Sequence, residues 1–81
     1  MMPLTADKLM NYLRDELGVD TREVAPATPL FSAGVIDSFV MVQLITYIED
    51  QCGFQVSAND VSLDNLDSIE RILAYVGRAT G

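Results

Sequence analysis

The sequence contains no histidine and only one cysteine, Cys52. Histidine is the commonest general base near neutral pH, so its absence argues against an enzyme that works with its own residues alone. Cys52 has no second cysteine for an internal disulfide and no histidine beside it for a zinc site. We therefore expect no enzyme activity and no metal site, and we expect Cys52 to pack as a small apolar side chain.

Basic residues are also scarce, since five Lys and Arg stand against twelve Asp and Glu, for a net charge of −7. This balance repels phosphate backbones and favours basic protein surfaces as partners, although it would also serve solubility alone. No run approaches the roughly 18–20 apolar residues of a membrane span, and the first residues lack the basic start of a secretory signal. We expect a cytoplasmic protein that binds neither nucleic acid nor membranes.

The chain does contain enough apolar residues for one small core. They make up 49% of its 81 residues, and Pro (three) and Gly (five) are few. A chain of this length buries only about 60–65% of the surface that it exposes when unfolded. We expect residues 1–81 to form a single stand-alone domain, and a monomer.

Helical spacing of apolar residues predicts two helices in the first two thirds of the chain. The first has Thr5 as its N-cap and Gly18 as its stop signal, and the second begins at Asp37–Ser38 and stops at Gly53. Their predicted inward stripes are Ala6, Leu9, Met10, Leu13 and Leu17 in the first, and Met41, Leu44, Ile45, Ile48 and Cys52 in the second.

The last third predicts a short helix and a longer one, after an extended connection at residues 54–56. The short helix begins at Ser57 or Ser62 and includes Leu63 and Leu66. In the last helix Asp67 and Glu70 fit a capping box, and Gly77 is its expected end. Its stripe is Ile69, Ile72, Leu73 and Val76. Three main helices, one short helix and no alternating strands indicate an all-α fold, a small four-helix bundle.

A long segment without periodicity, residues 19–36, separates the first two helices. It exceeds the roughly 12–15 residues beyond which structureless connections become uncommon and are usually functional. Four apolar side chains are expected to hold it against the helices: Leu30, Phe31, Val35 and Ile36.

Two Asp-Ser pairs, Asp37–Ser38 and Asp67–Ser68, stand at predicted helix starts, where helix capping alone explains either of them. Their contexts differ, because Ser38 follows the long loop and Ser68 lies in a tight junction. Loops held by a scaffold are where function concentrates. A serine at a helix N-terminus also places a phosphate ester beside free N–H groups and the positive end of the helix dipole. Ser38 is therefore the stronger candidate.

Residues 30–39, Leu-Phe-Ser-Ala-Gly-Val-Ile-Asp-Ser-Phe, resemble the phosphopantetheine attachment motif of the acyl and peptidyl (aminoacyl) carrier protein family. The similarity extends over about residues 5–77 and includes the connection 53–56 and the segment 65–69. It implies a four-helix bundle of the acyl-carrier type, with 4'-phosphopantetheine transferred from coenzyme A to Ser38. It also implies that Asp37 assists this attachment by helping to place magnesium in a separate transferase.

The resemblance further implies a protein that shuttles an acyl or aminoacyl thioester between biosynthetic enzymes. Its implied partners are a phosphopantetheinyl transferase, a loading ligase or acyltransferase, and downstream biosynthetic enzymes. Fatty-acid carriers usually show acidic residues soon after the serine, whereas Phe39, Val40 and Met41 follow it here. This pattern resembles carriers of specialised metabolism, of the polyketide or nonribosomal peptide type, and predicts an apolar partner contact at those three residues.

Two other hypotheses remain open at this point. One is an unmodified acidic helical adaptor that binds a basic protein. The other is a small hydrolase using Ser38 or Cys52, which the absence of histidine and of an oxyanion signature disfavours.

Overall fold

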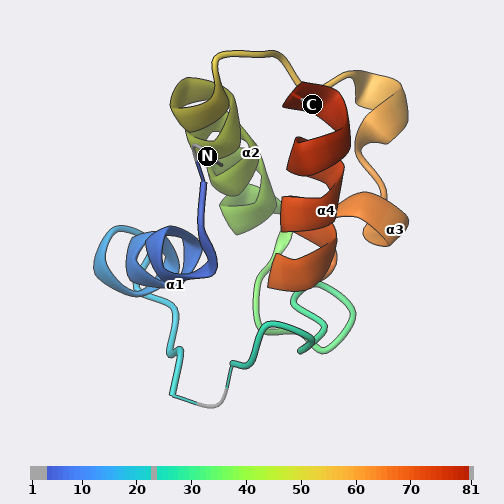
Figure 1. Cartoon of the computed structure of the whole chain (residues 1–81). Coiled ribbons are helices and arrows are strands. Elements are labelled where there is room, and N and C mark those ends of the chain that lie inside the picture. The colour runs from blue at the N-terminus through green and yellow to red at the C-terminus, as the bar shows by residue number, and fades with distance from the viewer. Residues whose placement is uncertain (1–3, 23, 81) are drawn as a thin grey trace.

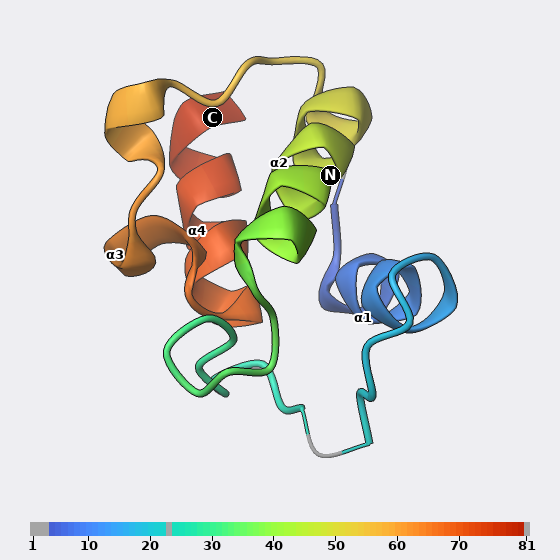
Figure 2. The ribbon, with the colours of Figure 1, turned by 180° about the vertical axis from the view of Figure 1, so that it is seen from behind.

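The computed structural model describes residues 4–22 and 24–80, which form four α-helices and one short 3-10 helix and contain no strand. The elements are α1 (Ala6–Asp15), α2 (Ser38–Cys52), η1 (Ala58–Asp60), α3 (Leu63–Leu66) and α4 (Ile69–Thr80). Helices α2 and α4 run side by side, with α1 at one end and α3 beside α4 (Figures 1 and 2). The all-α prediction is confirmed. None of the helices in the described ranges has the length and apolar character to cross a bilayer.

The core lies where the inner faces of the helices meet. The side chains of Leu9, Leu44 and Ile72 are fully buried there, at the predicted helical spacing. Tyr75 is buried as well, although its position was not expected in the stripe. Residues from outside the helices complete the core: Leu4, Val24, Leu30 and Ile36.

The predicted starts of α1 and α2 and the end of α2 are confirmed. The Thr5 hydroxyl accepts a hydrogen bond from the backbone N–H of Lys8 at 3.2 Å. The Asp37 carboxylate accepts one from the N–H of Val40 at 2.9 Å. Gly53 ends α2 with a φ of 72°, a left-handed conformation that glycine adopts without a steric cost.

The prediction for α4 is wrong at both ends. Ser68, not Asp67, caps the helix, because the Ser68 hydroxyl accepts from the N–H of Arg71 at 3.1 Å. Gly77 does not end it, since α4 continues to Thr80. A glycine that ends a helix commonly turns left-handed; Gly18 after α1 and Gly53 after α2 have this conformation, whereas Gly77 is not among the described glycines with positive φ.

Both serines that could have begun the short helix precede a helical element. Ser57 comes before η1, and its hydroxyl accepts from the N–H of Asn59 at 3.3 Å. Ser62 comes before α3, which contains Leu63 and Leu66. The segment 57–66 is therefore two short turns rather than one helix.

Candidate functional site

The chain reaches α2 through a compact loop of residues 30–36 that closes on itself. The carbonyl oxygen of Leu30 accepts hydrogen bonds from the N–H groups of Val35 at 2.9 Å and Ile36 at 3.1 Å. Gly34, with a φ of 76°, allows the chain to reverse. Leu30 and Ile36 are buried and Val35 packs against the core, as predicted for the apolar anchors of this loop, whereas the predicted anchor Phe31 is 39% exposed.

Asp67 holds this loop from the junction between α3 and α4. One carboxylate oxygen accepts from the N–H groups of Phe31 at 2.8 Å and Ser32 at 3.0 Å, and the other accepts from the Ser32 hydroxyl at 2.7 Å. The backbone carbonyl of Asp67 accepts from the N–H of Leu30 at 2.6 Å. Sequence reasoning assigned this aspartate to a helix cap and missed its contact with a loop 35 residues away.

The loop contacts favour the ionised form of the Asp67 carboxyl. Burial would raise the pKa of this carboxyl, but the hydrogen bonds from Ser32 and Phe31, with the nearby charge of Arg71, outweigh it and lower the pKa. A lowered pKa in the folded state means that the ionised carboxylate stabilises the fold above the unfolded-state value of 3.8. That stabilisation is lost as the pH falls through the folded-state pKa.

We therefore expect the free energy of unfolding to fall below about pH 4, with Asp67 contributing to the fall. Asp67→Asn should lower the free energy of unfolding at neutral pH. The difference in this free energy between the variant and wild type should become smaller as the pH falls. Urea unfolding from about pH 6 to about pH 2 measures this. Asp64→Asn, which removes an exposed carboxylate of α3, controls for the change in net charge. A difference that stays constant with pH would contradict the assignment.

Ser38 is the first residue of α2 and is exposed, while Asp37 before it is the cap. Among the described residues the Ser38 hydroxyl has no hydrogen-bond partner, and its exposure leaves it accessible from solvent. The first N–H groups of a helix have no partner within the helix, and the positive end of the dipole lies with them. This position favours an anionic group on the serine oxygen.

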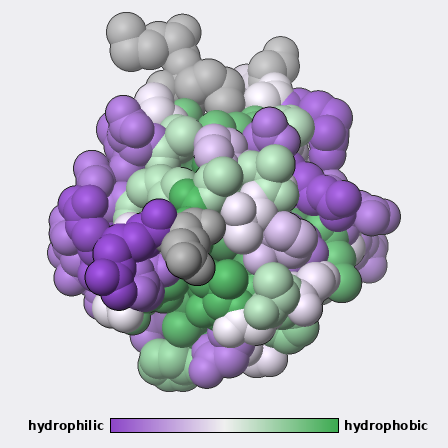
Figure 3. Space-filling view, turned by 90° about the horizontal axis from the view of Figure 1, so that it is seen from below, coloured by the Kyte–Doolittle hydropathy of each residue, from purple (hydrophilic) through white to green (hydrophobic). Residues whose placement is uncertain are grey.

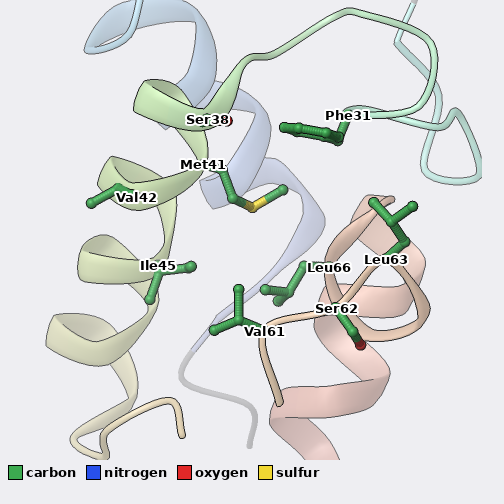
Figure 4. A pocket seen from close by; sticks show the side chains of 9 residues that line it. All are labelled: Phe31, Ser38, Met41, Val42, Ile45, Val61, Ser62, Leu63 and Leu66. Carbon is green, nitrogen blue, oxygen red and sulfur yellow. The ribbon is translucent and has the colours of Figure 1, made fainter. Parts of the chain in front are cut away.

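A groove of about 290 Å³ opens beside Ser38. Its walls come from the loop, from α2 and from the segment 61–66, and the ring of Phe31 points from the loop toward Ser38 and Met41 (Figure 4). Apart from two serines, every residue that lines it is apolar: Phe31, Ser38, Met41, Val42, Ile45, Val61, Ser62, Leu63 and Leu66. Ser38 therefore stands at the edge of an apolar groove.

The first turns of α2 present apolar side chains to solvent, but not all of those that were predicted. Phe39 is 70% exposed and Val42 is 63% exposed. Val40 is half-buried and packs against the core, and Met41 is buried at 9% exposure. Met41 therefore reaches the surface only as a wall of the groove, because it lies on the inward stripe of the helix. The residue that sequence reasoning missed is Val42, which lies one turn after Ser38.

A second cavity, of about 420 Å³, lies under the long loop and does not include Ser38 among its lining residues. Its walls mix valines with Asp20 and Thr28. Figure 3 looks at the molecule from this end and shows apolar surface beside strongly hydrophilic surface. Nothing in this lining concentrates one kind of chemistry.

The described residues show no arrangement for catalysis or for holding a metal. No three His, Cys, Asp or Glu side chains among them are grouped as metal ligands. Cys52 is partly buried, and burial raises the pKa of its thiol, which disfavours the nucleophilic thiolate. The hydrolase hypothesis gains no support from this geometry.

Comparisons with known proteins agree with this geometry. Residues 7–76 match the family of the phosphopantetheine attachment site. The chain is similar to the D-alanyl carrier protein of Enterococcus faecalis (strain ATCC 700802 / V583), with 31% identity over 70 residues, covering 86% of this chain and 90% of that protein. Its fold is similar to a chain in the crystal structure of an FAD-dependent dehydrogenase, with a TM-score of 0.69 and 23% identity, covering 80% of this chain and 92% of that one.

Proposed function

The chain belongs to the phosphopantetheine attachment site family of non-catalytic carrier proteins, and we propose that Ser38 is the residue on which it carries the 4'-phosphopantetheine group. The observation that supports this most strongly is the place of Ser38. It is an exposed serine at the start of a fifteen-residue helix, beside an apolar groove, in the segment that matches the family.

The residues around Ser38 fit such a group. Its exposed hydroxyl is accessible to a transferase, and the N–H groups of the first turn that have no partner within the helix lie at the same end of α2. Asp37 binds the N–H of Val40, which fixes the first turn of α2 and leaves an exposed carboxylate next to the serine. When bound, the group supplies a thiol that carries cargo as a thioester. The groove offers apolar surface beside the attachment point.

Intact mass spectrometry tests the assignment directly. The purified chain is incubated with coenzyme A, magnesium and a promiscuous phosphopantetheinyl transferase, and proteolysis then locates the change. We expect a mass gain of one phosphopantetheine group on the peptide that contains Ser38. A chain that gains no mass would overturn the proposal and leave the unmodified acidic adaptor as the better hypothesis.

The proposal extends to the cargo: an acyl or aminoacyl group in specialised metabolism of the polyketide or nonribosomal peptide type. Two observations support it. The first turn of α2 has no acidic residue, unlike the pattern usual in fatty-acid carriers, and a relative of 31% identity is a D-alanyl carrier. Hydroxylamine release of the thioester from chain isolated from its own cells identifies the cargo. A long straight fatty acyl group would contradict this part of the proposal.

Members of this family work with a transferase and with biosynthetic enzymes, and we propose that Phe39 and Val42 are the contact for these partners. They are the exposed apolar side chains of the first turns of α2, on either side of the position of Met41. We expect a loading ligase or acyltransferase that binds at Ser38 to contact them. Exposed apolar side chains next to an attachment point fit a partner surface with an apolar centre.

A further inference from the structure

Asp67 is the buried carboxylate that holds the loop before Ser38, and its side chain does not cap α4. It is 7% exposed, and Ser68 caps α4 in its place. Each hydrogen bond that its carboxylate accepts among the described residues is donated by Phe31 or Ser32. A buried ionised carboxylate is costly unless such partners satisfy it. The hydrogen bonds of the Asp67 side chain therefore hold the loop.

The position of the loop that Asp67 holds determines the position of Ser38. The Leu30 carbonyl binds the N–H groups of both Val35 and Ile36, so the segment 30–36 is braced internally. Ile36 is buried and is followed directly by Asp37, the cap of α2. No spare residues lie between the braced loop and the first turn of the helix, so a displaced loop would displace Ser38.

Asp67 also joins two walls of the groove. It follows Leu66, which lines the groove from α3, and it binds the N–H of Phe31, which lines it from the loop. Figure 4 shows Phe31 and Leu66 on the side of the groove that faces α2. One carboxylate therefore fixes the spacing of these walls and the position of the ring nearest the serine.

We propose that Asp67 is a positioning residue for the modification of Ser38, acting through the loop 30–36 without touching the serine. This inference rests on the proposed function of Ser38. The carboxylate holds the loop and the first turn of α2 in the placement that a transferase meets. A displacement of about 1 Å in a reacting group is enough to reduce a rate about 100-fold.

The test compares transferase kinetics on the full chain carrying Asp67→Ala, Asp67→Asn or the wild-type residue. All are assayed at a temperature at which circular dichroism shows them folded. We expect Asp67→Ala to lower kcat/KM for loading by about tenfold or more. Asp67→Asn keeps an amide oxygen for the Phe31 and Ser32 N–H groups and should retain most of the activity. Amide exchange at Phe31 and Ser32 should speed up in the alanine variant.

Two core variants separate positioning from loss of stability. Ile48→Val and Leu13→Ala remove fully buried groups that do not line the groove, and we expect their melting temperatures to lie on either side of that of Asp67→Ala. We expect both to be loaded at the wild-type rate. Equal slowing in these variants and in Asp67→Ala would overturn the inference, because stability alone would then explain the effect.

The remaining outcomes are also decisive. Loading of Asp67→Ala at the wild-type rate would overturn the role of Asp67 while the proposed function stands, whereas an unloaded wild-type chain would overturn the proposed function itself. If Asp67→Ala does not fold, Ser32→Ala removes only the hydroxyl bond of 2.7 Å. A smaller loss of kcat/KM in that variant supports the inference, and no loss contradicts it.

Discussion

Replacing Ser38 with alanine is expected to abolish phosphopantetheine loading completely. The transfer forms a bond to the serine oxygen, and alanine has no atom that could replace it. The variant should still fold, because Asp37 caps α2 and the exposed Ser38 side chain adds no hydrogen bond among the described residues. We expect its free energy of unfolding to stay within about 0.5 kcal/mol of wild type. Intact mass and urea unfolding measure the two effects.

Ser68→Ala is the matched control, since it alters the other Asp-Ser pair. Ser68 is buried and caps α4, so its loss should cost about 1 kcal/mol of stability. Loading should remain, because Ser38 is intact. A Ser38→Ala chain that still gains the phosphopantetheine mass would place the attachment elsewhere and refute the assignment of the site.

The two Asp-Ser pairs show what a local pattern can and cannot predict. In the first pair Asp37 caps the helix and leaves the serine exposed. In the second, Ser68 caps the helix and the aspartate turns to the loop. The helix start is shifted by one residue between the pairs, and the dipeptide does not encode that shift. The long loop before Ser38 favoured this serine as the attachment site, and the structure shows Ser38 exposed and Ser68 buried.

The features predicted correctly depend on neighbours within about one helical turn. The cap at Thr5, the start of α2 at Asp37–Ser38 and the turn at Gly53 are of this kind, and so is the inward stripe of α2. Hydrogen bonding to the nearest amides and burial at helical spacing are local rules.

The groove could not be predicted, and neither could the hydrogen bonds by which Asp67 holds the loop beside it. Both bring together segments that are distant in the sequence. The groove wall combines Phe31 of the loop with Leu66 of α3, and Asp67 reaches Ser32 across 35 positions. An apolar surface near Ser38 was expected, but its depth depends on how α3 packs. The exposure of single side chains within the apolar run after Ser38 depends on the same packing: Met41 is buried on the inward stripe, as predicted, and so does not offer the exposed partner contact that was also predicted for it.

The second large effect concerns stability: Leu44→Ala should destabilise the domain by about 2–5 kcal/mol, because it removes a fully buried side chain and leaves a cavity. A domain of this size has a total stability of roughly 4–12 kcal/mol. The melting temperature should therefore fall by about 10 °C or more. Calorimetry or circular dichroism measures it. A fall of only a few degrees would show that the core relaxes into the space.

Val42→Asp, two residues away on the same helix, should have the opposite effects: it should leave stability nearly unchanged and slow loading or transfer. Val42 is 63% exposed, so stability should change by no more than about 0.5 kcal/mol. It lines the groove beside Ser38, and losing its apolar contact with a partner should reduce kcat/KM for loading or transfer by about tenfold. Normal transfer with Val42→Asp would remove this residue from the partner surface. Together, the two variants separate the face of α2 that holds the fold from the face that meets other proteins.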